Sequence, residues 1–151
     1  MGDPPLATSL SLVSEVLRTA RDPWWIIGSA AVALHGGDAG YIADIDVIVS
    51  RRDLDALYDS LPLTDTPDDG KTMFRSQRFG RWAGPALDVE FMTGLEVLAN
   101  GAWEAVEPRT RIAVQCGEAT LYLPERFELI AILRLFGREK DLARAATILN
   151  Q

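Results

Sequence analysis

The chain has few of the residues and patterns that mark several common classes of protein. Its 151 residues include one cysteine, Cys116, which excludes an intrachain disulfide and a cysteine-based metal site. No segment approaches the roughly 20 consecutive apolar residues of a membrane span, and the first residues lack the basic and apolar segments of a signal peptide. We therefore expect a protein without a membrane span that remains in the reducing cytoplasm.

Positive charge is also scarce. The chain has 15 lysines and arginines against 22 aspartates and glutamates, a formal net charge of −7. Such a chain has no overall field that attracts DNA or RNA, which disfavours a nucleic-acid partner and leaves open only a local basic groove. Its length and its 48% hydrophobic content predict one domain over residues 1–151 with a single core.

The hydrophobic pattern mixes helical and strand periodicities, as is typical of an α/β or α+β domain. We expect a mixed β-sheet flanked by helices, with a core over 24–92 and two closing helices over about 125–150. In chain order, the first predicted elements are a helix near 9–21 after a loose Pro-Pro leader, a buried strand 24–27, a short helix 30–34 and a strand 44–49. The next are a helix capped by Ser50, with Asp53 three positions on, and a hairpin of 72–79 with 86–92. The last are a hairpin of 110–115 with 119–123 turning near Gly117, a helix 125–136 broken by Gly137, and a final amphipathic helix.

The most informative segment is the strand 44–49, which carries two aspartates. Asp44 and Asp46 lie two residues apart, so both carboxylates project from one face with backbone origins ~6.5–7 Å apart. Two such carboxylates repel each other, and their burial is costly unless a cation offsets the charge. Mg²⁺ is the natural candidate, because it commonly uses one or two carboxylates together with substrate phosphates.

A second acidic pair lies on the strand predicted near 86–92. Asp88 and Glu90 share one face of it, and either could complete a carboxylate triad. If the two strands lie side by side, the four acids form a patch that could hold two metal ions for phosphoryl or nucleotidyl transfer. The alternative is a merely polar face of a half-exposed sheet. Ile48 continues the acidic face and indicates that this face becomes buried further along.

Upstream of these acids, Gly28 and Ser29 follow a strand and precede a helix. In this arrangement backbone N–H groups at a helix N-terminus can bind phosphate. Gly-Ser turns after strands are also common for structural reasons, so this signal depends on the acids downstream.

The order of these motifs resembles that of the nucleotidyltransferase superfamily. "IIGSAAVALHG" followed by "DIDVIVS" is similar to small bacterial members of the minimal and abortive-infection types, including aminoglycoside-modifying relatives. The resemblance covers roughly 24–92. In the tail, Gly137-Arg138-Glu139-Lys140-Asp141 is similar to the start of the last helix of this family, and Arg134 takes the place of a lysine in the helix before it.

The resemblance implies a nucleoside triphosphate as donor, ATP above the others, and Mg²⁺ as cofactor. It implies Gly28 and Ser29 at the phosphates, Asp44 and Asp46 on the metal, and Glu90 as the third acid, with Asp88 as its neighbour or substitute. Arg134 and Lys140 are implied as nucleotide-binding residues. The chain departs from the family before Asp44, where Gly40-Tyr41-Ile42-Ala43 replaces the arginine and threonine of many relatives.

Three functions are compatible with these residues. The first is a magnesium-dependent nucleotidyltransferase that moves a nucleoside monophosphate to a hydroxyl acceptor, with Asp44, Asp46 and Glu90 on the metal and one carboxylate as base. The second is a catalytically inactive binding module, such as one half of a toxin–antitoxin pair, acting with a second subunit or protein. The third is a modifier of small cationic molecules of the antibiotic-resistance type.

Other conspicuous residues have structural explanations. His35 is the only histidine, and its place before Gly36-Gly37 is typical of a helix end. The four tryptophans are expected in the core or at its rim. For Arg75, Arg78 and Arg81, contact with phosphate or acceptor and a solvated strand face remain equal alternatives.

Overall fold

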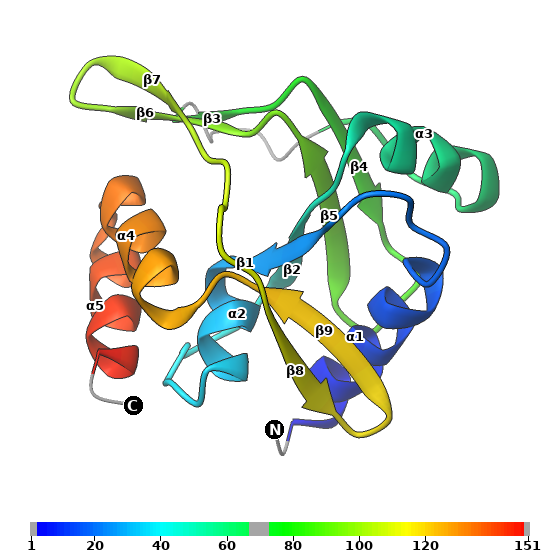
Figure 1. Ribbon diagram of the computed structural model, residues 1–151, viewed down its shortest axis with the longest axis horizontal. Helices are drawn as coiled ribbons and strands as arrows, with labels where there is room; N and C mark the ends of the chain where they lie inside the picture. The colour runs from blue at the N-terminus through cyan, green and yellow to red at the C-terminus, as the bar shows by residue number, and fades with distance from the viewer. Residues whose placement is uncertain (1–2, 67–72, 150–151) are drawn as a thin grey trace.

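The computed structural model describes residues 3–66 and 73–149 (Figure 1). Within these ranges it has five helices and nine strands. In chain order they are α1 (Pro4–Val16), β1 (Trp25–Ile27), α2 (Gly28–Leu34), β2 (Asp44–Ile48), α3 (Arg51–Ser60), β3 (Phe74–Arg75), β4 (Arg78–Trp82), β5 (Asp88–Thr93), β6 (Glu96–Ala99), β7 (Ala102–Ala105), β8 (Ile112–Cys116), β9 (Ala119–Leu123), α4 (Arg126–Phe136) and α5 (Glu139–Ile148).

The central sheet has four strands in the order β1-β2-β5-β4. Strands β2 and β5 are parallel, whereas β1 pairs with β2 and β4 pairs with β5 in antiparallel fashion. The predicted mixed sheet flanked by helices, with two C-terminal helices, is therefore confirmed. The two acidic strands lie side by side, which the sequence could state only as a condition.

A hairpin was predicted between a strand 72–79 and a strand 86–92. An antiparallel pair does form there, between β4 and β5, but the predicted first strand is not one continuous strand. Thr72 lies outside the described residues. The rest of that segment divides into β3, which pairs with β6, and β4, which pairs with β5. Gly80 lies within β4 because it packs against Leu63, Tyr58 and Leu54, where a Cβ atom would come within 2.9 Å of Leu63. The connecting loop is consequently later and shorter than predicted.

Two further predictions need correction. Helix α1 begins at Pro4 and ends at Val16, whereas the sequence predicts 9–21, because proline is well tolerated in the first turn of a helix and the Pro-Pro pair forms that turn. The hairpin β6–β7 was not predicted. Its turn residues Asn100 and Gly101 have φ of 53° and 79°, typical of the type I′ turn that Asn-Gly favours, so the signal was in the sequence.

Apolar side chains form two clusters on the two faces of the central sheet. The larger cluster contains Ile45 and Val47 of β2 and Val89 and Phe91 of β5, and α1 packs there. The smaller cluster lies on the acidic face, where Ile48 packs with Phe79, Met92 and other residues. The prediction that Ile48 marks burial of this face is confirmed.

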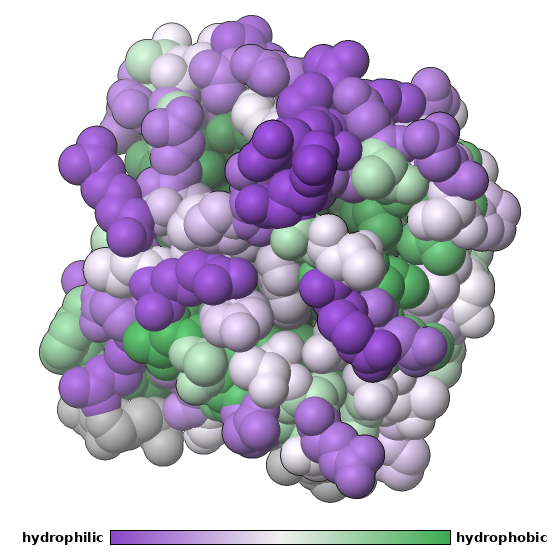
Figure 2. All heavy atoms as spheres, turned by 45° about the vertical axis from the view of Figure 1, so that its right-hand side comes forward, coloured by the Kyte–Doolittle hydropathy of each residue, from purple (hydrophilic) through white to green (hydrophobic). Residues whose placement is uncertain are grey.

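Figure 2 shows one face of the molecule, on which hydrophilic residues are prominent and hydrophobic residues are visible mainly between them. Within the described part of the chain, no helix is both long and apolar enough to span a membrane.

Helices α4 and α5 lie side by side (Figure 1). Glu125 caps α4 by accepting hydrogen bonds from the backbone N–H groups of Phe127 and Glu128, and Gly137 ends it with φ of 71°, as predicted for a glycine break. Asp141 in the first turn of α5 pairs with Arg138 at 2.6 Å. These contacts fix the start of α5, which contributes to the candidate site described below.

Asp53 in α3 connects that helix to the loop before β1. Asp53 is 4% exposed, and its carboxylate accepts hydrogen bonds from the backbone N–H groups of Arg21 (2.8 Å) and Asp22 (3.0 Å). Its own backbone N–H donates to Oγ of Ser50, which confirms the predicted cap. Asp53 thus links the segment that leads into the central sheet to the helix that follows β2.

We expect Asp53→Ala to lower the free energy of unfolding by about 2–4 kcal/mol, because two part-buried hydrogen bonds from backbone N–H groups lose their charged, buried acceptor. Urea denaturation followed by circular dichroism measures this change. Asp59→Ala is the matched control, since Asp59 is an exposed residue of the same helix, and it should change the free energy by less than about 0.5 kcal/mol. Equal effects of the two substitutions would contradict the role given to Asp53.

Candidate functional site

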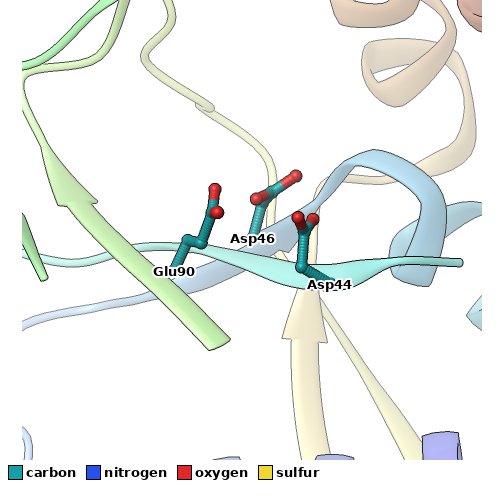
Figure 3. Close-up of side chains that lie close together, drawn as sticks. All are labelled: Asp44, Asp46 and Glu90. Carbon is teal, nitrogen blue, oxygen red and sulfur yellow. The ribbon is translucent and has the colours of Figure 1, made fainter. Parts of the chain in front are cut away.

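Three carboxylates meet on the acidic face of the central sheet. Asp44, Asp46 and Glu90 each offer one oxygen, and these oxygens lie within 4.8 Å of one another (Figure 3). Figure 3 shows the three side chains projecting to the same side of the two strands. Glu90 is buried, with 5% exposure, whereas Asp44 and Asp46 are half-buried.

The parallel register of β2 and β5 produces this cluster. Asp44 pairs with Asp88 and Asp46 pairs with Glu90, so residues of the same face are brought level with each other. Asp88 nevertheless lies outside the group of three and contacts Arg81, with 3.5 Å between its Oδ2 and Nη1 of Arg81. Of the two candidates for a third acid, the geometry places Glu90 beside Asp44 and Asp46.

Gly28 lies directly beside this cluster. Ile27 pairs with Asp46 in the antiparallel β1–β2 ladder, and the chain turns into α2 immediately afterwards. Gly28 has φ of +70°, which favours glycine, and a Cβ atom there would lie 2.9 Å from Oδ2 of Asp46. The glycine is therefore required both by the turn and by the close approach of the Asp46 carboxylate.

Arg81 supplies a positive charge next to the three acids. It pairs with Glu90 across the β4–β5 ladder, and its Nη2 lies 2.7 Å from Oε2 of Glu90. From the sequence, Arg81 had two equal interpretations, a residue of a solvated strand face or a contact to phosphate or acceptor. The register of the β4–β5 hairpin would have identified Glu90 as the partner of Arg81, but the predicted strand 72–79 ends before Arg81 and so did not give that register.

A cavity of about 1160 Å³ opens over the acids. It is lined by the acidic cluster, by Gly28 and Ser29, by an apolar group and by a basic group. The apolar group includes Phe74, Phe79, Met92, Leu95 and Phe136, and the basic group comprises Arg75, Arg78, Arg138, Lys140 and Arg144. The cavity thus combines carboxylates, cations and an apolar floor in one space large enough for a nucleotide.

The structure separates the two cations that the resemblance assigned to the nucleotide. Lys140, in the first turn of α5, lines the cavity. Arg134, in the last turn of α4, is exposed and is not among the lining residues. On this geometry Lys140 remains a candidate for nucleotide binding and Arg134 loses its support.

Helix α5 also holds the loop that precedes β2. Arg144 donates from Nε to the carbonyl oxygen of Ala39 at 2.8 Å and from Nη2 to that of Tyr41 at 3.1 Å, and the backbone N–H of Asp38 donates to Oγ1 of Thr147 at 3.0 Å. Tyr41 is 83% exposed and lines the cavity. The sequence gave no signal for these contacts because they join segments more than 100 positions apart.

His35 and the tryptophans, for which the sequence predicted structural roles, make structural contacts. His35 lies at the end of α2, and its Nε2 is 2.9 Å from the carbonyl oxygen of Pro124. Trp24 and Trp82 are buried, and the Trp103 ring is covered by the guanidinium of Arg75 at 4.0 Å.

The chemistry of the acidic cluster fits a hard divalent cation. Carboxylate oxygens are the ligands that Mg²⁺ prefers, and three of them converge here at the edge of a cavity. Asp44, Asp46 and Glu90 are the residues that would hold the ion. Arg81 offsets part of their negative charge through its ion pair with Glu90.

We expect Gly28→Ala to weaken divalent-ion binding as well as to lower stability by about 1–2 kcal/mol, because the new Cβ displaces the Asp46 carboxylate in addition to straining the backbone. Urea denaturation and Mn²⁺ titration measure the two effects. Gly117→Ala is the control, since Gly117 has φ of +61° and open space around its Cβ position. It should lose similar stability and keep Mn²⁺ affinity. A Gly28→Ala protein with unchanged Mn²⁺ affinity would contradict the close packing described here.

No protein-family model matches the chain, and a comparison with curated proteins finds no significant match. Solved structures do resemble it. A Thermotoga maritima protein assigned as a nucleotidyltransferase aligns with a TM-score of 0.66 at 20% identity, over 99% of this chain and 96% of its own. An antigenic nucleotidyltransferase-like protein from Paracoccidioides brasiliensis aligns with a TM-score of 0.63 at 15% identity, over 97% of this chain and 76% of its own.

A third similar structure is that of ANT(2'')-Ia in complex with adenylyl-2''-tobramycin. It aligns with a TM-score of 0.59 at 14% identity, over 95% of this chain and 88% of its own. At these identities the likeness concerns the fold. The chain has a nucleotidyltransferase-like fold, as the resemblance of its motifs predicted.

Proposed function

We propose that this protein is a magnesium-dependent nucleotidyltransferase that moves a nucleoside monophosphate from a nucleoside triphosphate to a hydroxyl acceptor. The observation that supports it most strongly is the convergence of Asp44, Asp46 and Glu90 beside Gly28 at the edge of a large cavity. The fold of its structural neighbours supports the same kind of reaction.

In the proposed reaction, the acceptor hydroxyl oxygen forms a bond to the α-phosphorus of the triphosphate. The bond from that phosphorus to the bridging oxygen breaks, and pyrophosphate leaves with the electron pair. One carboxylate of the cluster accepts the hydroxyl proton. Asp44, Asp46 and Glu90 would hold Mg²⁺, which, when bound, supplies charge neutralisation for the triphosphate and the carboxylates.

The donor triphosphate would bind between the turn at Gly28-Ser29 and the start of α5. Ser29 is a buried polar residue that lines the cavity, and Lys140 lines it from α5. Backbone N–H groups of the turn and the ammonium group of Lys140 both favour phosphate. We propose ATP as the donor and the cytoplasm as the compartment, where such donors are available.

The acceptor is a hydroxyl compound. In one structural neighbour the bound compound is adenylyl-2''-tobramycin. The cavity of this chain is lined by five basic residues and by six acidic ones, Asp38, Asp44, Asp46, Asp65, Glu90 and Asp141. The charge of its lining therefore favours neither a cationic nor an anionic acceptor.

An inactive binding module remains the second candidate. The observation that favours it is the loop 38–41, which lies over the cavity, is anchored by Arg144 and presents the exposed Tyr41 where many relatives have arginine and threonine. Such a module, acting with a partner protein as in a toxin–antitoxin pair, would bind nucleotide without turnover.

We expect Asp46→Asn to reduce pyrophosphate release from a nucleoside triphosphate by about a hundredfold or more, because it removes a charged metal ligand. The assay uses each of the four triphosphates with Mg²⁺ and a small-molecule extract as the source of acceptor. Asp65→Asn, which changes a cavity acid outside the group of three, should retain activity within about threefold. Unchanged release by Asp46→Asn would refute the proposed mechanism.

Calorimetry distinguishes the two candidates when no turnover is found. Wild-type protein that binds a triphosphate only with Mg²⁺, together with a folded Asp44→Ala/Asp46→Ala variant that does not bind, would establish the metal site. Nucleotide binding without turnover in any extract would favour the binding module.

We expect Lys140→Met to weaken binding of the Mg²⁺-triphosphate by about fivefold, the size of a partly exposed charge contact. Arg134→Met removes the same charge from a position outside the cavity lining and should leave affinity within about twofold. Calorimetric titration of both variants measures the difference. A larger loss in Arg134→Met would contradict the placement of the nucleotide in this cavity.

A further inference from the structure

The loop between α2 and β2 is fastened to α5 at several points. Arg144 donates hydrogen bonds to the carbonyl oxygens of Ala39 and Tyr41, and the backbone N–H of Asp38 donates to Oγ1 of Thr147. Ala39 is buried, and Arg144 is half-buried. The backbone that carries Tyr41 is therefore held in one position by the protein itself.

Tyr41 places a large ring in water at this fixed point. It is 83% exposed, and of the exposed large hydrophobic side chains in the described part of the chain it alone lines the cavity. The rings of the other two tyrosines are approached by cations, Tyr58 by Arg78 at 4.1 Å and Tyr122 by Arg111 at 3.6 Å. Tyr41 has no such contact with a described residue. A tyrosine on a fixed backbone has few torsions left to order, so it offers a contact surface at low entropic cost.

The surroundings of this ring indicate which ligand it serves. Lys140 and Arg144 lie four residues apart in α5, so they share one side of the helix, and both line the cavity. Lys140 is the proposed contact of the donor phosphates, and Arg144 contacts the backbone of Tyr41. A ligand that meets both Lys140 and Tyr41 needs phosphate groups and a flat ring. A nucleoside triphosphate carries both.

We propose that Tyr41 stacks on the base of the donor nucleotide and that Arg144 is the positioning residue that holds the tyrosine there. The inference rests on the proposed function, because it concerns the donor of the same site. Every nucleobase has a face on which an aromatic ring can stack. Tyr41 therefore adds affinity for all four nucleoside triphosphates without choosing among them.

The test is calorimetric titration of the four nucleoside triphosphates and of inorganic tripolyphosphate, each with Mg²⁺. We expect Tyr41→Ala to weaken binding of the nucleoside triphosphates about tenfold, the usual size of one base–aromatic stack. Tripolyphosphate has no base, so its affinity should stay within about twofold. Tyr41→Phe keeps the ring and should bind every ligand as wild type does.

Nuclear magnetic resonance observes the stack directly. The base protons of a nucleoside triphosphate bound to wild type should shift upfield in the ring current of Tyr41, and this shift should be lost in Tyr41→Ala. A merely structural role of Tyr41 would produce no such shift. Because the side chain is exposed, Tyr41→Ala is expected to keep the fold, and circular dichroism checks this.

Two further variants control for simpler explanations. Phe127→Ala removes an aromatic side chain that is 58% exposed and lies outside the cavity lining, and it should leave every affinity within about twofold. Arg144→Met removes the anchor of the loop together with a cavity charge, so it should weaken tripolyphosphate as well. In the Arg144→Met background, Tyr41→Ala should cost less than about threefold, because the ring is no longer held over the donor site.

Unchanged affinity for the nucleoside triphosphates in Tyr41→Ala would overturn the inference, as would an equal loss for tripolyphosphate. A full tenfold loss in the Arg144→Met background would overturn the role given to Arg144. If wild type binds a nucleoside triphosphate and Tyr41→Ala binds it equally well, only the inference fails. If wild type binds none of the four with Mg²⁺, the proposed function and the inference fail together.

Discussion

Mutual repulsion among carboxylates is the constraint on which the rest of this structure depends. Asp44, Asp46 and Glu90 have oxygens within 4.8 Å of one another, and Glu90 is buried. Like charges at this distance and burial destabilise a fold unless other interactions offset them. Here Arg81 supplies part of the offset through its ion pair with Glu90, and a divalent ion would supply more of it. A cluster that costs stability and opens into a cavity is a mark of function more than of folding.

Hydrophobic burial holds the acids together against this repulsion. Alternate residues of β2 and β5, Ile45 and Val47 with Val89 and Phe91, are fully buried in the larger core. A slip of the register by one residue would bring apolar side chains to the acidic face and carboxylates to the core. Further along the acidic face, Ile48 and Met92 anchor the same strands in the smaller core. Each acidic strand is therefore packed on both faces, which fixes the strand positions from which the carboxylates project.

The cavity over the acids depends on the end of the chain. Helix α5 contributes Lys140 and Arg144 to its wall, and Arg144 anchors the loop before β2 through two backbone carbonyl groups. The loop in turn contributes the exposed Tyr41 to the cavity wall. Five basic residues thus line the space where a triphosphate would bind, together with six acidic ones, although the net charge of −7 gives no hint of the basic group.

The sequence by itself determined the features that depend on neighbours along the chain. Alternation placed Asp44 and Asp46 on one face of a strand, and the turn at Gly28 and the cap at Ser50 followed from local chemistry. The Asn100-Gly101 turn was equally local and was missed. Tertiary structure brought Glu90, which the resemblance favoured over Asp88, to the aspartates, and it alone decided that Arg81 faces Glu90 and that Lys140 but not Arg134 lines the cavity. The physical reason is that these outcomes depend on strand register and on which side of a helix packs inward, and both are set by burial against segments far away in the sequence.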